Sequence, residues 1–415
     1  MREMKDSGVK WVGEIPSSWK VYKVKQIADS NNDVLPENYE EEQEIDYIEI
    51  GSVTYEHGVR TTEKMKFGNA PSRARRIVHN GDTIISTVRT YLKAIAYIND
   101  SLADKIVSTG FSVVTPHKDV VAKFLYYALS THSFISNVEA HSVGISYPAI
   151  NNTNLMDLKI VLPMQREQIQ IASYLDAKCS KIDEIIEKQH AIIEKLKEYK
   201  LSYINEVTNV NDGIKCHLGF IGQMKNGLNF TDTSEGHKIK FLGVGDFKDN
   251  FFVDKEEMFS TIISEENVAE DYMLHSGDIV FVRSNGSKEL VGRAVMVNGI
   301  EYPVTYSGFC IRFRNIRPDI IDSKFLLYYF RSLDFRKQLE KYSQGSNISN
   351  LNQDLLSSLQ FTIPSKDYQK RRLDEMEIKC KEIDNAVIKF EGMNNKLQEY
   401  KKSLIYEVVT GKKEV

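Results

Sequence analysis

The chain repeats itself at an offset of 201 residues. Residues 123–127 read Lys-Phe-Leu-Tyr-Tyr, and residues 324–329 read Lys-Phe-Leu-Leu-Tyr-Tyr. Apolar runs end at Pro163 and at Pro364, and the difference 364 − 163 is 201. A repeat of this length is a duplicated domain rather than a solenoid unit. The duplication predicts pseudo-two-fold symmetry, which suits a target with two halves.

Each copy begins with a strand-rich module. β-Branched and aromatic runs bounded by turn formers predict strands that begin near Tyr47, Thr83 and Phe111, and near Phe241, Ile279 and Phe309. Helical spacing follows over 120–137 and 323–342. The pattern predicts two mixed α/β (α+β) modules. Their strand regions match but their loops differ, as expected for binding modules with different targets.

Each module is followed by a long helical segment. Residues 165–209 contain no Gly or Pro, and their apolar positions mostly recur every three or four residues, as in a coiled-coil seam. We expect an antiparallel helix pair with a seam of Leu175, Ile182, Ile186, Ile193 and Leu196 against Met376, Ile383, Val387, Phe390 and Leu397. The predicted boundaries are modules at 1–163 and 210–364, and spacer helices at 164–209 and 365–415.

Composition narrows the class of protein. The chain has 415 residues, 41% of them hydrophobic, and a formal net charge of −4, so a nucleic-acid surface must be a local patch. It has no apolar run long enough to span a membrane and no signal-peptide pattern at Met1, so we expect a cytoplasmic protein. The four cysteines are far apart, which argues against a zinc site or a disulfide framework. Cys179 and Cys380 occupy equivalent positions, and antiparallel helices would keep them too far apart for a disulfide.

Three passages resemble the specificity subunit of type I restriction-modification systems. They are the opening Gly-Val-Lys-Trp-Val-Gly-Glu-Ile-Pro-Ser-Ser-Trp (8–19), the Leu-Pro, Glu-Gln and Leu-Asp pairs within 162–176, and the repeated Leu-x-Glu-Tyr-Lys helix ends at 196–200 and 397–401. The resemblance covers essentially the whole chain. The second copy departs from it, since Gln369 has no Glu before it.

The resemblance implies a non-catalytic DNA-recognition subunit. In this family two target-recognition domains each read one half of a split site in double-stranded DNA, and two long antiparallel helices set the distance between them. The implied partners are two methyltransferase subunits, with restriction subunits joining through them. The chain itself would hold no cofactor or metal, and S-adenosylmethionine, ATP and Mg would be bound by the partner subunits.

Three other functions compete with this interpretation. A self-contained methyltransferase is suggested by Phe-Leu-Gly-Val-Gly at 241–245, but a lone glycine pair after a strand more often forms a tight turn. A nuclease is suggested by the acidic residues at 319–322, where a helix N-cap at Asp322 or Ser323 is the simpler explanation. A coiled-coil scaffold that binds only protein is the third reading. Methyl transfer by the chain alone, or failure of the partner complex to retain specific DNA, would identify these rivals.

Clusters of basic residues indicate where DNA would bind. Arg and Lys neutralise phosphates, and Arg or Asn can make bidentate contacts to base edges. The candidates are Arg60, Lys64, Lys66, Arg73, Arg75, Arg76, Arg89 and Lys93 in the first module, and Arg283, Ser284, Asn285, Lys288 and Arg293 in the second. Glu63 is the only acidic residue between positions 60 and 76. A secondary group, Arg312, Arg314 and Arg317, is expected to be turned away by strand alternation.

Two polar loops leave their role open. Gly144 and Gly345 lie 201 residues apart in loops that precede the last strand of each module. Each loop faces DNA or a partner, or it is simply a turn that needs positive φ. The DNA sequence recognised and the spacer length do not follow from the residues.

Overall fold

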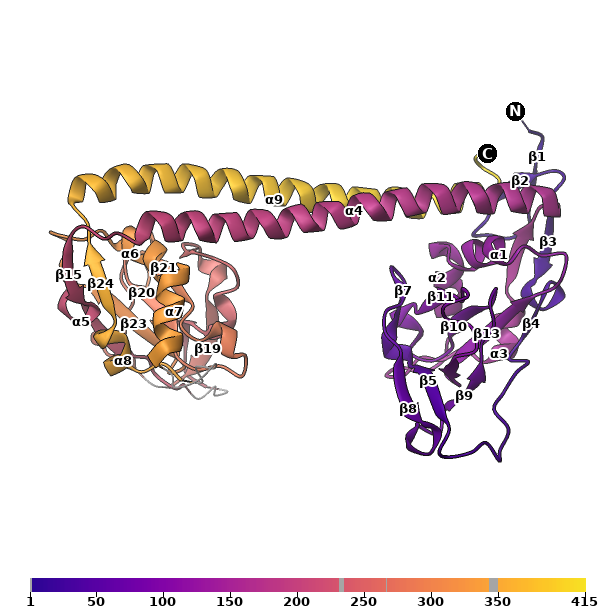
Figure 1. Ribbon diagram of the computed structural model, residues 1–415, viewed down its shortest axis with the longest axis horizontal. Coiled ribbons are helices and arrows are strands. Elements are labelled where there is room, and N and C mark those ends of the chain that lie inside the picture. Colours follow the sequence, from indigo (N-terminus) through magenta and orange to yellow (C-terminus); the bar gives the residue numbers. More distant parts are fainter. Residues whose placement is uncertain (1, 231–234, 266, 343–349) are drawn as a thin grey trace. The chain divides into compact units, whose positions relative to one another are not determined.

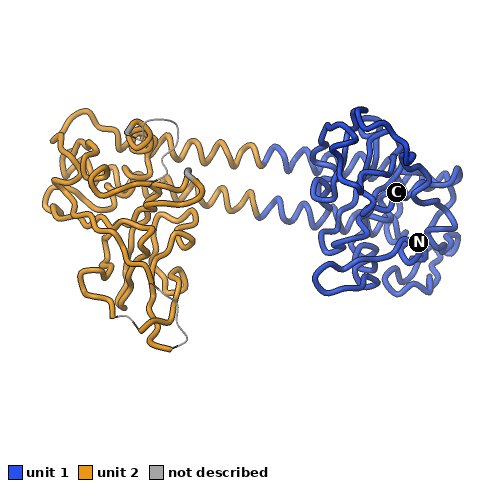
Figure 2. The backbone as a smooth tube through the Cα atoms, turned by 90° about the horizontal axis from the view of Figure 1, so that it is seen from below, with its two compact units in different colours: residues 1–189, 392–415 blue, residues 190–391 orange. Residues whose placement is uncertain are grey.

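The computed structural model describes residues 2–230, 235–265, 267–342 and 350–415. It divides into two compact units, coloured separately in Figure 2. Unit 1 contains Met1–Gln189 and Gly392–Val415, and unit 2 contains His190–Glu391. The division falls within the two long helices, so each unit holds one module together with part of both helices (Figure 1).

Two four-stranded sheets form the centre of the first module. One has the order β11-β10-β13-β4 and the other the order β8-β5-β12-β9, in which β5 and β12 run parallel. Three two-stranded pairs, β1-β2, β3-β14 and β6-β7, complete the unit. The strands are β1 (Met4–Asp6), β2 (Glu14–Pro16), β3 (Lys20–Lys23), β4 (Ala28–Ser30), β5 (Glu44–Ile48), β6 (Val53–Thr54), β7 (Gly58–Val59), β8 (Glu63–Lys66), β9 (Ala74–Ile77), β10 (Thr83–Ser86), β11 (Ile95–Tyr97), β12 (Ile106–Ser108), β13 (Phe111–Pro116) and β14 (Lys159–Leu162).

The second module repeats the central strand order of both sheets, but one sheet has five strands and the other has three. Its sheets are β16-β23-β20-β21-β18 and β19-β17-β22, with β17 and β22 parallel, and its first and last strands pair as β15-β24. The strands are β15 (Ile214–His217), β16 (Gly222–Asn226), β17 (His237–Leu242), β18 (Phe252–Val253), β19 (Ser260–Ser264), β20 (Ile279–Val282), β21 (Ala294–Val297), β22 (Thr305–Tyr306), β23 (Cys310–Asn315) and β24 (Gln360–Ile363).

Three helices recur at the 201-residue offset. They are α1 (Ala122–Leu129), α2 (His132–Ala140) and α3 (Asn152–Met156), and α6 (Ser323–Phe330), α7 (Leu333–Tyr342) and α8 (Gln353–Ser358); the second copy also has the short α5 (Leu218–Ile221). The sequence predicted one helix where each unit has two. Thr131 and Ser332 explain the break, because their hydroxyls accept the backbone N–H three residues on and cap a new helix.

The long helices pair antiparallel within each unit. α4 (Gln165–Thr208) and α9 (Lys366–Val409) each contain 44 residues. In unit 1 Asp183 of α4 bonds Lys401 of α9 at 2.6 Å, and in unit 2 Lys200 of α4 bonds Asp384 of α9 at 2.7 Å. Both ion pairs obey one register, since 183 + 401 and 200 + 384 both equal 584. The pairs are therefore copies of one another at the 201-residue offset.

A buried glutamine fastens each long helix to its own module. Gln168 accepts a hydrogen bond from the Val121 backbone N–H at 2.8 Å and donates one to the Pro163 carbonyl at 2.9 Å. Gln369 does the same for Asp322 and Pro364, at 2.9 and 2.8 Å. The residue before the glutamine differs because its partners differ. Glu167 accepts from the Trp19 indole, whereas the Tyr368 hydroxyl donates to the Val207 carbonyl.

The seam differs from the prediction at its ends. Leu175 packs with Leu404 and Val408 in the core of unit 1, and Met376 packs with Ile204 in the core of unit 2, because the antiparallel register sends these residues to opposite ends. Buried as predicted are Ile182, Ile186, Ile193 and Ile383, while Leu196, Val387, Phe390 and Leu397 are half-buried. All four cysteines are free, and burial raises the pKa of both Cys179 and Cys380 to about 11.

One layer of the helix pair is polar. Gln189 and Asn394 are buried, and amide atoms of both have no hydrogen-bond partner in the described part of the chain. Their counterparts at the 201-residue offset, Phe390 and Ile193, are apolar. A single polar layer in an apolar seam costs stability and fixes register, so we interpret this asymmetry as a register device.

Candidate nucleic-acid interface

The basic residues of the first module lie on separate strands. Lys64 and Lys66 belong to β8 and Arg75 and Arg76 to β9, at opposite edges of the sheet β8-β5-β12-β9. Three strand spacings of about 4.8 Å separate the two edges by about 14 Å. The basic residues between 60 and 76 thus lie along both edges of a sheet and do not form one compact cluster.

The fold brings acids to this surface that sequence proximity did not show. Lys66 bonds Glu42 at 2.6 Å, and Arg73 forms an ion pair with Glu49. Exposed pairs of this kind contribute about 0–1 kcal/mol, so a phosphate can replace the carboxylate at little cost. Arg60 and Lys64 are exposed and have no ion pair within the described residues.

Two arginines of β9 are held in other ways. The Arg75 guanidinium lies 5.1 Å from the centre of the Phe67 ring. Arg76 is half-buried, and burial lowers its pKa. Because Arg76 is half-buried, it has less surface to offer a phosphate than the exposed Arg60.

Arg89 and Lys93 flank a strained turn that follows β10. Both have positive φ, 50° and 54°, around the 3₁₀ turn Thr90–Leu92. For residues with a side chain this conformation costs about 1–3 kcal/mol each and marks functional loops. Lys93 bonds Glu139 at 3.4 Å, whereas the exposed Arg89 stacks 5.1 Å from the Tyr147 ring.

The Gly144 loop packs directly on this turn. Gly144 has φ +115°, and a Cβ there would lie 3.0 Å from the Tyr147 carbonyl oxygen, so the turn requires glycine. Val143 and Ala149 exchange backbone hydrogen bonds of 2.8 and 3.0 Å that close the loop. The turn explanation is therefore correct for Gly144, and the loop also lies beside a candidate DNA-binding residue. Gly345 lies outside the described residues.

The second module presents a counterpart loop after β20. The Leu351 N–H donates to the Arg283 carbonyl at 2.8 Å, just as the Ile150 N–H donates to the Thr87 carbonyl at 2.9 Å in the first module. The Arg283 guanidinium donates to the Gly308 carbonyl. Both modules therefore hold a loop at the same place on the same framework.

The remaining candidates of that loop have defined surroundings. Asn285 accepts the Ser287 backbone N–H at 2.8 Å, and Ser284 is half-buried. Lys288 begins the 3₁₀ turn Lys288–Leu290. Arg293 pairs with Asp249 at 3.1 Å. DNA contact by these residues stays a prediction.

Arg312 and Arg314 on β23 are turned inward, as strand alternation suggested, whereas Arg317 lies beyond the end of the strand and is partly exposed. Arg312 is fully buried and donates to the Asp271 carbonyl at 2.9 Å. Arg314 makes two bonds of 2.7 Å to Asp278, and this pairing raises its pKa. Arg317 pairs with Asp319 at 3.0 Å. The contacts of Arg312 and Arg314 therefore stabilise the module.

The segments that suggested catalysis have structural roles. Gly243 donates its backbone N–H to Asp246 at 2.7 Å in a tight turn after β17. Asp322 caps α6 by accepting the Lys324 N–H at 2.7 Å. The matched Asp82 and Asp278 also close turns, accepting backbone N–H groups at 2.7 Å from the residue three before.

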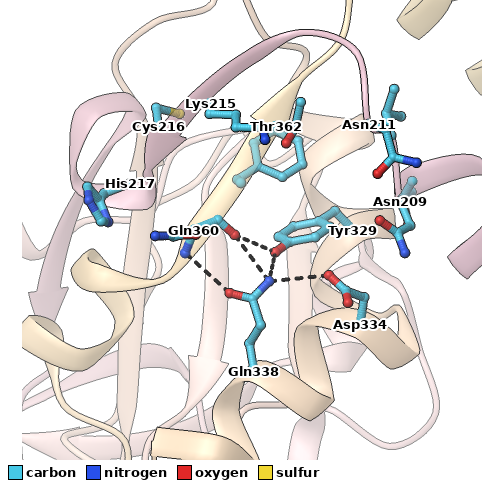
Figure 3. Close-up of a pocket in the computed structure, with 13 residues that line it drawn as sticks. Asn209, Asn211, Lys215, Cys216, His217, Tyr329, Asp334, Gln338, Gln360 and Thr362 are labelled. Atoms are coloured by element: carbon cyan, nitrogen blue, oxygen red, sulfur yellow. Dashed lines mark hydrogen bonds between the residues drawn. The ribbon is translucent and has the colours of Figure 1, made fainter.

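A polar pocket lies beside the end of α4 in unit 2, and four of its residues are joined by hydrogen bonds (Figure 3). The cavity measures about 420 Å³. Gln338 donates to the Tyr329 hydroxyl at 2.8 Å and to Asp334 at 3.2 Å, and Tyr329 donates to the Gln360 carbonyl at 2.8 Å. Burial raises the pKa of Cys216, which disfavours its thiolate. The bonded residues link α6, α7 and β24 at this pocket.

The described residues contain neither a metal-binding cluster nor a membrane-spanning helix. No group of three or more His, Cys, Asp or Glu there could hold a metal ion. None of the described helices is long and apolar enough to cross a membrane.

The comparison with protein families decides the identification. The model of the type I restriction modification DNA specificity domain matches twice, at residues 16–198 and 216–404. The chain belongs to this family. The two matches coincide with the two copies of the repeat, so each module with its helix is one family domain.

Individual relatives agree with this assignment. The chain is 24% identical over 308 residues to the type I restriction enzyme StySPI specificity subunit of Salmonella potsdam, covering 68% of this chain and 65% of that protein. It is 27% identical over 194 residues to the MjaIX specificity subunit of Methanocaldococcus jannaschii, covering 45% and 43%. The aligned part is thus less than two thirds of each of these relatives.

Solved structures show the same fold. A chain from a structure describing complex assembly and conformational transition of the type I R-M system has a TM-score of 0.75 at 19% identity, covering 95% of this chain and 98% of that one. The HsdS subunit from Thermoanaerobacter tengcongensis has a TM-score of 0.53 at 19% identity, covering 98% and 99%. The predicted fold class, two α/β modules with two long antiparallel helices, is confirmed.

Proposed function

We propose that this chain is the DNA sequence-recognition subunit of a type I restriction-modification complex. The observation that carries the proposal is one loop framework built twice with different side chains. Equivalent strands and equivalent backbone hydrogen bonds hold the loop after β10 in the first module and the loop after β20 in the second. Like frameworks with unlike side chains suit the reading of two different half-sites.

The chain would recognise DNA and leave the chemistry to its partners. The partners would be two methyltransferase subunits, with restriction subunits joining through them in the cytoplasm, where host DNA lies. S-adenosylmethionine, ATP and Mg would be bound by those subunits. An adenine flipped out of the duplex would be methylated by the partner. The helix pair would set the number of unread base pairs between the half-sites.

A repeated apolar face on the helices supports two copies of one partner. Ile192 and Met393 correspond at the 201-residue offset and are each 41% exposed. Tyr199 and Tyr400 also correspond, at 49% and 52%. Exposed apolar side chains retained in both copies mark equivalent interaction sites. Ile192 and Tyr199 on α4 would contact one methyltransferase subunit, and Met393 and Tyr400 on α9 would contact the other.

Native mass spectrometry of the assembled complex tests the two docking sites. Tyr199→Asp and Tyr400→Asp should each lose one methyltransferase subunit, and the double variant should lose both. Ile388→Glu is the matched control, because Ile388 is 65% exposed but the first copy already has glutamate, Glu187, at its position. Full occupancy in the double variant would show that the subunits dock elsewhere.

Genome-wide mapping of methylated adenine tests the recognition role. Cells that express the methyltransferase subunits with this chain should carry methylation at a bipartite motif with a constant gap. Cells without this chain should lose that methylation, and the purified chain with S-adenosylmethionine should transfer no methyl group. Methyl transfer by the chain alone, or an uninterrupted motif, would overturn the proposal.

A further inference from the structure

Exposed apolar side chains form a ridge on the surface of the first module. It consists of two packed loops, 87–93 and 141–149, which we call the paired loops. Their large side chains are unusually exposed: Ile145 is fully exposed, Val143 is 80% exposed and Tyr147 67%, with Tyr91 and Leu92 beside them. Side chains of this kind on a monomer's surface mark an interaction site.

The paired loops are held in one shape by internal bonds. The Thr90 hydroxyl donates to the Ser142 hydroxyl at 2.8 Å, and Ser142 donates to the Val138 carbonyl at 2.8 Å. Backbone bridges join Ala149 to both Val88 and Val143. A loop that is already fixed in one shape loses little conformational entropy when it binds a partner. Its exposed apolar groups therefore bind at a low entropy cost.

Charge favours a nucleic acid as the occupant. The paired loops contain no Asp or Glu, in a chain where acidic residues outnumber Lys and Arg by 58 to 54. The exposed cation on the ridge is Arg89, whose guanidinium is stacked at 5.1 Å on the Tyr147 ring. Stacking leaves the edge of a guanidinium free to donate two parallel hydrogen bonds.

We infer that the paired loops enter the major groove of the first half-site and read thymine methyl groups through Ile145 and its apolar neighbours, beside a guanine held by Arg89. This inference rests on the proposed DNA-recognition function. Apolar side chains contact the thymine C5-methyl, and Arg is the usual bidentate donor to guanine O6 and N7. The counterpart loop of the second module has Arg283, Ser284 and Asn285 instead. The second half-site is therefore read through hydrogen bonds more than through methyl groups.

The test removes methyl groups from DNA and apolar groups from protein in one cycle. Duplexes carrying the mapped site receive deoxyuridine for thymidine in one half-site at a time, and binding by the assembled complex is measured. Each contacted methyl should contribute about fourfold in affinity, from about 0.8 kcal/mol per buried CH₂. Uracil in one half-site should weaken binding, while uracil in the other should leave it within twofold.

The protein arm assigns the effect to the ridge. Ile145→Ser should lose about tenfold on thymine duplexes and much less on duplexes that already carry uracil in the sensitive half-site. Met164→Ser is the matched control, since Met164 is 72% exposed in the same module and the second copy has Ser365 at its position. Arg89→Lys should weaken binding at the guanine while keeping the charge, because lysine lacks the bidentate fork.

The outcomes separate this inference from the function on which it rests. If the unmodified complex shows no preference for the mapped site, the proposed function fails. If it binds the site but both uracil duplexes and Ile145→Ser bind as well as the unmodified pair, the ridge does not read methyl groups. Loss of methyltransferase subunits from the Ile145→Ser complex, with DNA specificity intact, would make the ridge a protein-docking surface and overturn the inference.

Discussion

Replacing Gln168 or Gln369 by alanine should loosen one long helix from its own module. Each glutamine is 1% exposed. Its side chain links the first turn of its long helix to the start of a helix in its module and to the proline before the long helix. In Gln168→Ala the Val121 N–H and the Pro163 carbonyl lose their bonds of 2.8 and 2.9 Å. An unsatisfied buried group costs about 1–3 kcal/mol, so two give a loss of about 2–6 kcal/mol. Gln369→Ala should cost at least as much, because Gln369 also donates to the Ile320 carbonyl at 2.9 Å.

Urea unfolding combined with hydrogen exchange measures these losses unit by unit. Unfolding of a two-unit chain need not be two-state, so exchange protection in α1 and α6 reports each unit separately. Gln170→Ala, an exposed change two residues along the same helix, should stay within about 0.5 kcal/mol. The two losses should add in the double variant because the sites lie in different units. If Gln168→Ala were no less stable than Gln170→Ala, the linking role would be wrong.

Three further changes probe the helices. Replacing Gln189 and Asn394 together by leucine should stabilise the protein by at least about 1 kcal/mol in thermal unfolding, since buried amides lose their desolvation cost; destabilisation would mean that they have partners. Burial raises the pKa of Cys179 and Cys380 to about 11, so alkylation of these two thiols in the folded protein should accelerate only as pH approaches 11; rapid labelling of either at pH 8, located by peptide mapping, would contradict this. Stability should fall between about pH 9 and 11, because the thiols of the unfolded chain ionise first. Inserting four residues near Gln189 lengthens α4 by about 6 Å, so the methylated motif should gain one or two base pairs of gap, at about 3.4 Å each, with unchanged half-sites; an unchanged gap would refute the spacer role.

The repeat made the architecture predictable from sequence. An offset of 201 residues, helical spacing without Gly or Pro, and matching turn formers are local or periodic signals, so they survive in a single sequence. The first long helix begins and ends within a residue of its predicted bounds, whereas α9 ends at Val409, six residues before the predicted 415. The break between α1 and α2 was missed because one capping hydroxyl, that of Thr131, decides it.

The candidate interface was less predictable, because it depends on what the fold brings together. Glu42 and Glu49 approach the basic residues only through strand pairing and turns that sequence spacing does not reveal. Ile145 and Tyr147 carried no charge signal, and their exposure is set by a hairpin that packs on a loop more than 50 residues earlier. Apolar residues in a loop that lacks acids were the signal that could have found them.

Selection of bound duplexes from a random library tests the central claim most directly. The assembled complex should enrich two short sequence blocks separated by an unread gap of constant length. A second complex, in which residues 210–364 come from another member of the family, should change one block and leave the other block and the gap intact. A single uninterrupted block, or a change in both blocks after exchange of one module, would contradict the account.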